Sequence, residues 1–140
     1  MTGARKNVKI YGCVEIYRLQ LLYQRASVFN TETYLDFLER IARYYYPQVI
    51  YYIQDNASYH KDDFVWEWFT ANQSWWRVYN LPEYSPELNA AERIWHHVRM
   101  KATHNRYFAD EGELLSTVTG AFRSIQRKPN QIQGYMRSFL

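Results

Sequence analysis

The sequence has a single cysteine, Cys13, among its 140 residues. One cysteine cannot form an intrachain disulfide, and it does not supply the thiolate cluster of a structural zinc site. No apolar stretch approaches the roughly 20 residues that span a membrane, and the first residues contain no apolar signal core. These absences argue against a disulfide-rich secreted domain and against a membrane protein. We expect a soluble protein of the reducing cytoplasm.

Glycine and proline are also few, with 5 Gly and 4 Pro. No internal repeat, low-complexity segment or flexible linker divides the chain, and 140 residues can bury one substantial core but not two. The sequence therefore predicts one domain over residues 1–140. Helical periodicity is lost near Pro129, so residues 129–140 are expected to form either a loose tail or a short helical one.

The net charge is small, +3 from 17 Lys and Arg against 14 Asp and Glu. By itself it indicates no particular partner, but basic side chains gather in one predicted helix and the loop after it. Such a cluster can neutralise the phosphates of a DNA backbone, although a solvated helix face has the same composition. The residues that we expect at a DNA interface are Arg93, His96, Arg99, Lys101 and Arg106.

Hydrophobic periodicity predicts alternating strands and helices. Residues 7–16 and 18–26 alternate in polarity and should form a hairpin. A helix over residues 31–45, capped by Asn30 or Thr31, should be followed by a strand over residues 49–53. The other expected elements are a helix over 61–70, a strand over 76–81, a helix over 89–103 and a final helix capped by Asp110. This order predicts an α/β domain.

Two acidic residues occupy positions suited to metal binding. Asp55 follows the apolar run 49–53, and Glu92 lies in the first turn of a predicted amphipathic helix. Carboxylate oxygens are the hard ligands that Mg²⁺ and Mn²⁺ prefer, and pairs of such ions can drive phosphodiester cleavage. Each acid also has a structural explanation, because Asp55 opens a loop where Asx side chains bond to the backbone, and Asn89 to Glu92 has capping-box spacing.

Other polar residues near these acids are secondary candidates. Asn56 can polarise the site, and His60 can orient a phosphate or a metal-bound water, although His60 fits equally well as a polar residue before the next helix. His96 and His97 are adjacent and therefore do not face one another on a helix, which disfavours zinc. The predicted buried stripe of the 89–103 helix consists of Leu88, Ala91, Trp95, Val98 and Ala102, and the neighbouring stripe facing the site consists of Glu92, His96 and Arg99.

Four blocks of sequence between about residues 7 and 115 form a specific combination. They are the strand followed by Asp55-Asn56-Ala57 and His60, the segment from Leu81-Pro82 through Tyr84-Ser85-Pro86 to Asn89, the helix start Glu92-Arg93-Ile94-Trp95, and Thr103-His104-Asn105-Arg106-Tyr107-Phe108. In these blocks the chain resembles the catalytic domain of bacterial insertion-sequence transposases of the mariner superfamily.

The resemblance implies a ribonuclease H-like fold and metal-dependent cleavage and strand transfer on DNA, at transposon ends and at the target. In that family three carboxylates, Asp, Asp and Glu, hold Mg²⁺ or Mn²⁺. Asp55 matches the second of these carboxylates and Glu92 matches the third.

The family's first Asp has no counterpart in this sequence. It belongs on the opening strand, upstream of residues 7–14, and none of residues 1–6 is acidic. We therefore expect a ribonuclease H-like mixed sheet, flanked by helices, without its first strand. The gap should expose strand edges that pair with another copy or with full-length transposase, or should let the neighbouring strands close on each other. The alternative to an active core is an inactive fragment that only binds DNA or transposase.

Overall fold

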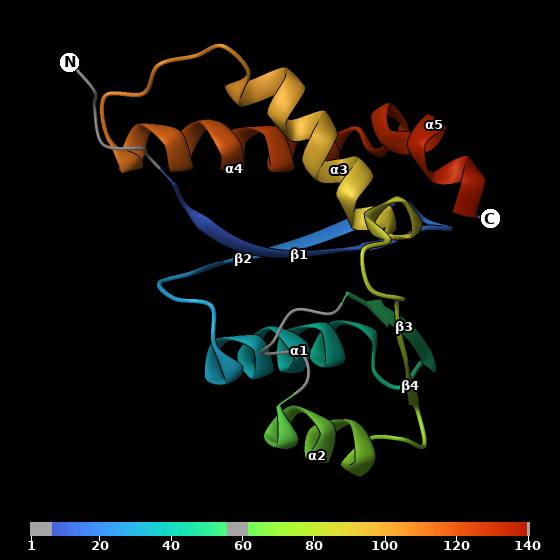
Figure 1. Ribbon diagram of the computed structural model, residues 1–140. Coiled ribbons are helices and arrows are strands. Elements are labelled where there is room, and N and C mark those ends of the chain that lie inside the picture. The colour runs from blue at the N-terminus through green and yellow to red at the C-terminus, as the bar shows by residue number, and fades with distance from the viewer. Residues whose placement is uncertain (1–6, 56–61, 140) are drawn as a thin grey trace. The chain divides into compact units, whose positions relative to one another are not determined.

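The structure, a computed structural model, describes residues 7–55 and 62–139 (Figure 1). The chain divides into two compact units, one formed by Met1–Arg25 with Ala90–Leu140 and the other by Ala26–Asn89. We call them the hairpin unit and the parallel unit, after the sheet that each contains, and describe each by itself. The prediction of one domain stays a prediction.

The hairpin unit combines a two-stranded sheet with helices. Strand β1 is Lys9–Glu15, and it pairs with β2, Gln20–Ala26. The boundary between the units falls at the end of β2, because Ala26 is the first residue of the parallel unit. The connection at residues 16–19 is too short for a parallel crossover, so the pair is an antiparallel hairpin. The helical elements are α3 (Ala90–Val98), a π-helical turn (Arg99–Thr103), α4 (Glu111–Arg127), α5 (Gln133–Met136) and 3₁₀ turns at Pro129–Ile132 and Arg137–Phe139.

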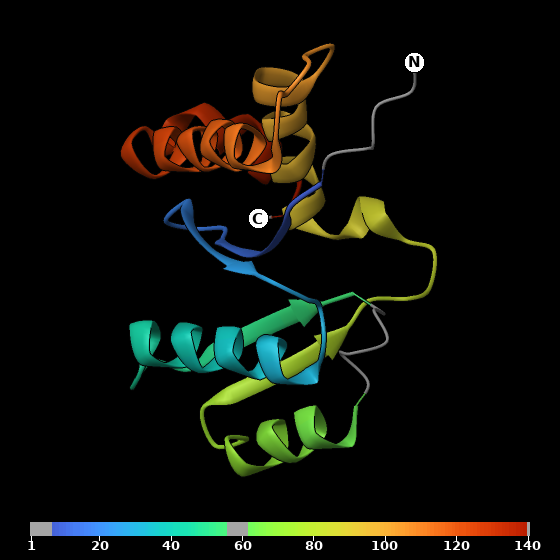
Figure 2. The ribbon, with the colours of Figure 1, turned by 90° about the vertical axis from the view of Figure 1, so that its left-hand side faces the viewer.

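Helices α3 and α4 lie on the same side of the hairpin (Figures 1 and 2). Alternate residues of β1 and its flanks face these helices, as the period of two along a strand requires. Burial of this shared apolar surface holds the unit together. The hairpin supplies Val8, Ile10, Val14, Ile16 and Leu21 to this core, and the helices supply Ile94, Val98, Leu114, Val118, Phe122 and Ile125.

Strand β1 approaches α3 most closely at Gly12. A Cβ atom at this position would lie 2.6 Å from the ring of Trp95, which is closer than carbon atoms can pack. The Trp95 ring in turn meets Phe122 of α4, with ring centroids 5.3 Å apart. The absence of a side chain at Gly12 therefore lets α3 settle on the hairpin.

The parallel unit contains α1 (Thr31–Tyr45), β3 (Ile50–Gln54), α2 (Asp63–Ala71) and β4 (Trp76–Asn80), followed by a 3₁₀ turn at Pro86–Leu88. A capping box begins α1. The Asn30 side chain accepts a hydrogen bond from the backbone N–H of Thr33 at 2.9 Å, and the Thr33 hydroxyl accepts one from the N–H of Asn30 at 3.1 Å. These bonds satisfy two backbone donors at the helix start.

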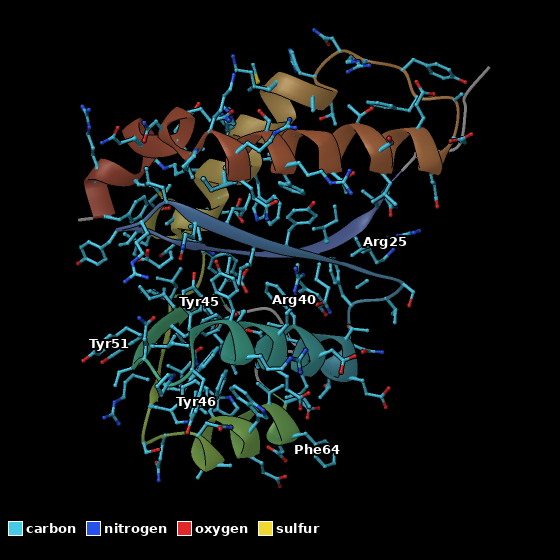
Figure 3. All side chains as sticks on the ribbon, turned by 180° about the vertical axis from the view of Figure 1, so that it is seen from behind. Arg25, Arg40, Tyr45, Tyr46, Tyr51 and Phe64 are labelled. Carbon is cyan, nitrogen blue, oxygen red and sulfur yellow. The ribbon has the colours of Figure 1, made fainter. Side chains whose placement is uncertain are left out.

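Strands β3 and β4 are parallel, with Tyr52 in register with Val78. Both helices of the unit cover the same face of this pair. The hydroxyl of Tyr52 is 2.8 Å from that of Tyr34 in α1, and the ring of Tyr52 is 6.4 Å from that of Phe69 in α2. Tyr51 points the other way, is 71% exposed, and extends outward from β3 in Figure 3.

The predicted α/β class is confirmed, with small sheets flanked by helices. Element ends agree with the expected ones to within about two residues, except that the α-helical part of the 89–103 segment ends at Val98. The C-terminal segment up to Phe139 forms short helical turns that bury Ile132 and Met136. Over residues 7–55 and 62–139 the strands form two sheets of two strands each. In the same ranges, none of the helices has the length and hydrophobicity of a membrane-spanning segment.

Candidate functional site

Asp55 directly follows the last residue of β3 and is exposed. The carboxyl ends of neighbouring parallel strands meet at one edge of a sheet, and ligands commonly bind there. The segment after β4 is held at the same edge, because the N–H of Leu81 donates to the carbonyl of Gln54 at 2.8 Å. Asp55 therefore lies where an α/β sheet is suited to present a carboxylate to a ligand.

A chain of polar side chains reaches the residue before Asp55. Gln54 is 3% exposed, and its Oε1 accepts a hydrogen bond from the Tyr34 hydroxyl at 2.6 Å. Its Nε2 donates to Oδ1 of Asn80 at 2.7 Å. These bonds join α1 to the carboxyl ends of β3 and β4. Sequence patterns did not identify these three residues, although an amide side chain that closes an apolar strand was an available signal.

Glu92 lies in the first turn of α3 and is partly buried. A carboxylate at this position is stabilised by the positive end of the helix dipole. Packing fixes the helix that carries it, since Ile94 and Val98 are only 1% and 4% exposed and Trp95 closes on Gly12. The position of Glu92 in the hairpin unit thus depends on apolar contacts.

The buried side of α3 differs from the predicted stripe. Its buried residues are Ile94, His97 and Val98, and Ala102 is buried in the π-helical turn. Leu88, predicted to be buried, is 48% exposed. That prediction was wrong because Leu88 belongs to the preceding 3₁₀ turn, so its direction is not set by the periodicity of α3.

His97 has a structural role that the sequence analysis did not assign. It is 6% exposed, with Nδ1 3.2 Å from the Tyr135 hydroxyl and Nε2 3.0 Å from Oε1 of Gln131. Both ring nitrogens are used to join α3 to the C-terminal segment. The adjacent His96 is exposed, so the two imidazoles do not act as a pair.

The basic residues predicted at a DNA interface are accessible. Arg106 is also held in place, because its Nη1 donates to the carbonyl of Ala102 at 3.2 Å and its guanidinium lies 5.4 Å from the centre of the Phe108 ring. The hairpin unit therefore presents cationic side chains from α3 and the segment after it. The exposed residues are Arg93, His96, Arg99, Lys101 and Arg106.

The two predicted metal ligands belong to different units, Asp55 to the parallel unit and Glu92 to the hairpin unit. Their meeting in one site stays a prediction. Both offer hard oxygen donors of the kind that Mg²⁺ and Mn²⁺ take. Within the described ranges, no group of three or more His, Cys, Asp or Glu residues is arranged to hold a metal ion. Asn56 and His60 lie outside the described residues.

Comparison with known protein families gives a match that spans both acids. The family model of the DDE superfamily endonucleases matches residues 1–115, a range that includes Asp55, Glu92 and the five exposed basic residues. No match was found among curated proteins. Because the matched range covers well over half of the sequence, the chain belongs to the DDE superfamily endonucleases.

Proposed function

We propose that the chain is a catalytic core of a DNA transposase of the mariner superfamily, which cleaves phosphodiester bonds and transfers the cut strands. The observation that carries the proposal is the family match over residues 1–115, since it spans both Asp55 and Glu92. The family implies DNA as the substrate. The finer assignment to insertion-sequence transposases rests on the sequence blocks that surround the two acids.

Asp55 and Glu92 are the proposed ligands of Mg²⁺ or Mn²⁺, and DDE superfamily endonucleases generally use divalent metal ions. The chemistry that such ions supply is activation of a water or a DNA hydroxyl and stabilisation of charge on the phosphodiester. The chain itself contributes two carboxylates, one directly after β3 and one in the first turn of α3. Asn56 is proposed to polarise the site through its amide, and His60 is proposed to orient a phosphate or a metal-bound water.

The exposed basic residues of the hairpin unit are proposed to contact DNA phosphates. Phosphate contacts position a duplex but do not read its sequence, so binding should be salt-sensitive and largely sequence-independent. Arg93→Ala combined with Arg99→Ala should weaken binding equally for a terminal-repeat duplex and a scrambled duplex. Fluorescence anisotropy at two salt concentrations measures this, with Arg127→Ala as a control outside the cluster. A strong terminal-repeat preference that survives high salt contradicts the proposal.

The catalytic proposal is tested by nicking of transposon-end DNA in the presence of Mn²⁺. The assay compares the 140-residue chain with a version extended by an upstream strand that carries an Asp. We expect the extended version to nick DNA and the Asp55→Ala and Glu92→Ala variants to lose at least about 100-fold in rate, as expected when a metal ligand is removed. Glu67→Ala is the control for Asp55→Ala and Glu111→Ala is the control for Glu92→Ala, because each removes an exposed carboxylate from the same unit as the acid that it is compared with.

The outcomes separate an active core from an inactive fragment. Nicking that survives Asp55→Ala contradicts the assigned site. Equal nicking by both versions, abolished by Asp55→Ala, shows that no further carboxylate from an added strand is needed. If neither version nicks DNA but both bind it, the alternative of a DNA-binding fragment without catalysis replaces the proposal.

The outer edge of β3 is the proposed self-association surface. The N–H of Ile50 and the carbonyl of Gln54 bond toward β4, so the intervening Tyr51 and Ile53 direct their main-chain groups away from it. The side chains of Tyr51 and Ile53 are 71% and 55% exposed. Such apolar edges pair with other chains. Sedimentation velocity should show dimers that Tyr51→Lys dissociates, and a wild-type chain that stays monomeric at all concentrations contradicts this.

A further inference from the structure

We propose that Gln54 is a positioning residue for Asp55, acting through hydrogen bonds that run from Tyr52 through Tyr34 and Gln54 to Asn80. We call these four side chains the Gln54 network. The inference rests on the proposed function of Asp55 as a metal ligand. It adds residues that act on that ligand through the structure and do not touch the metal themselves.

The direction of each bond in the Gln54 network follows from donor chemistry. The single hydroxyl proton of Tyr34 is donated to Oε1 of Gln54, at 2.6 Å. In the contact between the two tyrosine hydroxyls, at 2.8 Å, Tyr52 must therefore be the donor. Gln54 then donates from Nε2 to Asn80 at 2.7 Å. Each side chain fixes the orientation of the next.

Burying Gln54 is unfavourable unless its amide is hydrogen-bonded. Gln54 is 3% exposed, yet it ends a strand whose preceding residues are apolar. An aliphatic side chain at this position could be buried without the cost of desolvating an amide. Buried polar networks of this kind restrict a structure to one arrangement, because alternatives leave polar groups unpaired. The restriction applies at the residue that immediately precedes Asp55.

The Gln54 network joins three elements at this point. Tyr34 belongs to α1, Gln54 ends β3 and Asn80 ends β4. The backbone is held at the same level, since the Gln54 carbonyl accepts from the N–H of Leu81 at 2.8 Å. The direction in which the chain leaves β3 toward Asp55 is therefore set by both side-chain and main-chain bonds.

The test is a titration of the 140-residue chain with MnCl₂, followed by broadening of the backbone amide signals next to Asp55. Gln54→Met keeps the size of the side chain and removes both amide bonds, and it should weaken Mn²⁺ binding about tenfold, the lower end of the effect seen for residues that orient metal ligands. Tyr34→Phe removes one bond to Gln54 and should weaken binding less. Without metal, the Leu81 amide should exchange its hydrogen faster in Gln54→Met.

Two control variants separate positioning from stability and from ligation. Val65→Ala truncates a fully buried residue of the same unit outside the Gln54 network, so it should lower the melting temperature without changing Mn²⁺ affinity. Asp55→Asn should abolish the broadening. If Asp55→Asn does so but Gln54→Met keeps wild-type affinity, or weakens it no more than Val65→Ala does, the positioning role is wrong and the ligand role stands. If Asp55→Asn changes nothing, the ligand role is wrong and the positioning role falls with it.

Discussion

The hairpin unit and the parallel unit are built alike but position their acids differently. Each unit has a two-stranded sheet with helices on one face. Among the described residues, the buried polar side chain of the parallel unit is Gln54 and that of the hairpin unit is His97. Gln54 is the direct neighbour of Asp55. His97 lies more than a turn beyond Glu92 and bonds to the C-terminal segment. The position of Asp55 thus depends on hydrogen bonds made by the residue beside it, whereas the position of Glu92 depends on how α3 packs.

The largest effect should come from truncating one core phenylalanine in each unit. Phe122 of the hairpin unit is 0% exposed and Phe37 of the parallel unit is 1% exposed. Either change to Ala should cost about 3–5 kcal/mol of unfolding free energy, because it leaves a cavity. Denaturant titration combined with hydrogen exchange measures the loss. Each variant should lose protection mainly in its own unit, and equal losses in both units would contradict the division.

A smaller effect is expected where β1 meets α3. Gly12→Val should cost about 1–3 kcal/mol, because the new side chain overlaps the Trp95 ring and α3 must shift. The control is Gly120→Ala in α4, where a Cβ meets nothing within 4 Å and removal of a helical glycine should gain about 0.5–1 kcal/mol. Urea denaturation measures both. A Gly12→Val chain as stable as the wild type contradicts the close contact.

The smallest effects should come from the two helix caps. Asn30 caps α1 in the parallel unit, and Asp110 caps α4 in the hairpin unit by accepting from the N–H of Glu113 at 2.8 Å. Replacing either cap with Ala should cost about 1 kcal/mol, since one backbone donor loses its partner. Matched urea titrations of the two variants measure this. A cost well above that value in one unit only would show that its cap also supports tertiary contacts.

Local signals in the sequence predicted the elements and both caps. The Asn30 cap and the strand before Asp55 follow from residue type and periodicity over a few positions, and both are observed. Leu88 was predicted to be buried because it was counted with the periodicity of the 89–103 helix, whereas it belongs to the separate 3₁₀ turn that precedes α3.

Long-range partners could not be predicted. Gln54 is held by Tyr34 and Asn80, which lie 20 and 26 positions away, and the amide that closes the apolar strand does not by itself identify these partners. The burial of His97 likewise depends on Gln131 and Tyr135 in the C-terminal segment. The two acids were recognised from their flanking sequence, which carries the family resemblance. The predicted meeting of the two acids involves both units, and the fold of neither unit determines it.

Asp55 and Glu92 are proposed to bind one divalent ion together, and this is the proposal on which the rest depends. It is tested most directly by Mn²⁺ titration of the wild-type chain, Asp55→Ala, Glu92→Ala and the double variant, followed by amide broadening near both residues. The account predicts one shared midpoint in the wild type, weaker binding at each residue when the other acid is removed, and a double variant hardly worse than either single one. Broadening near Asp55 that is unchanged by Glu92→Ala would contradict it.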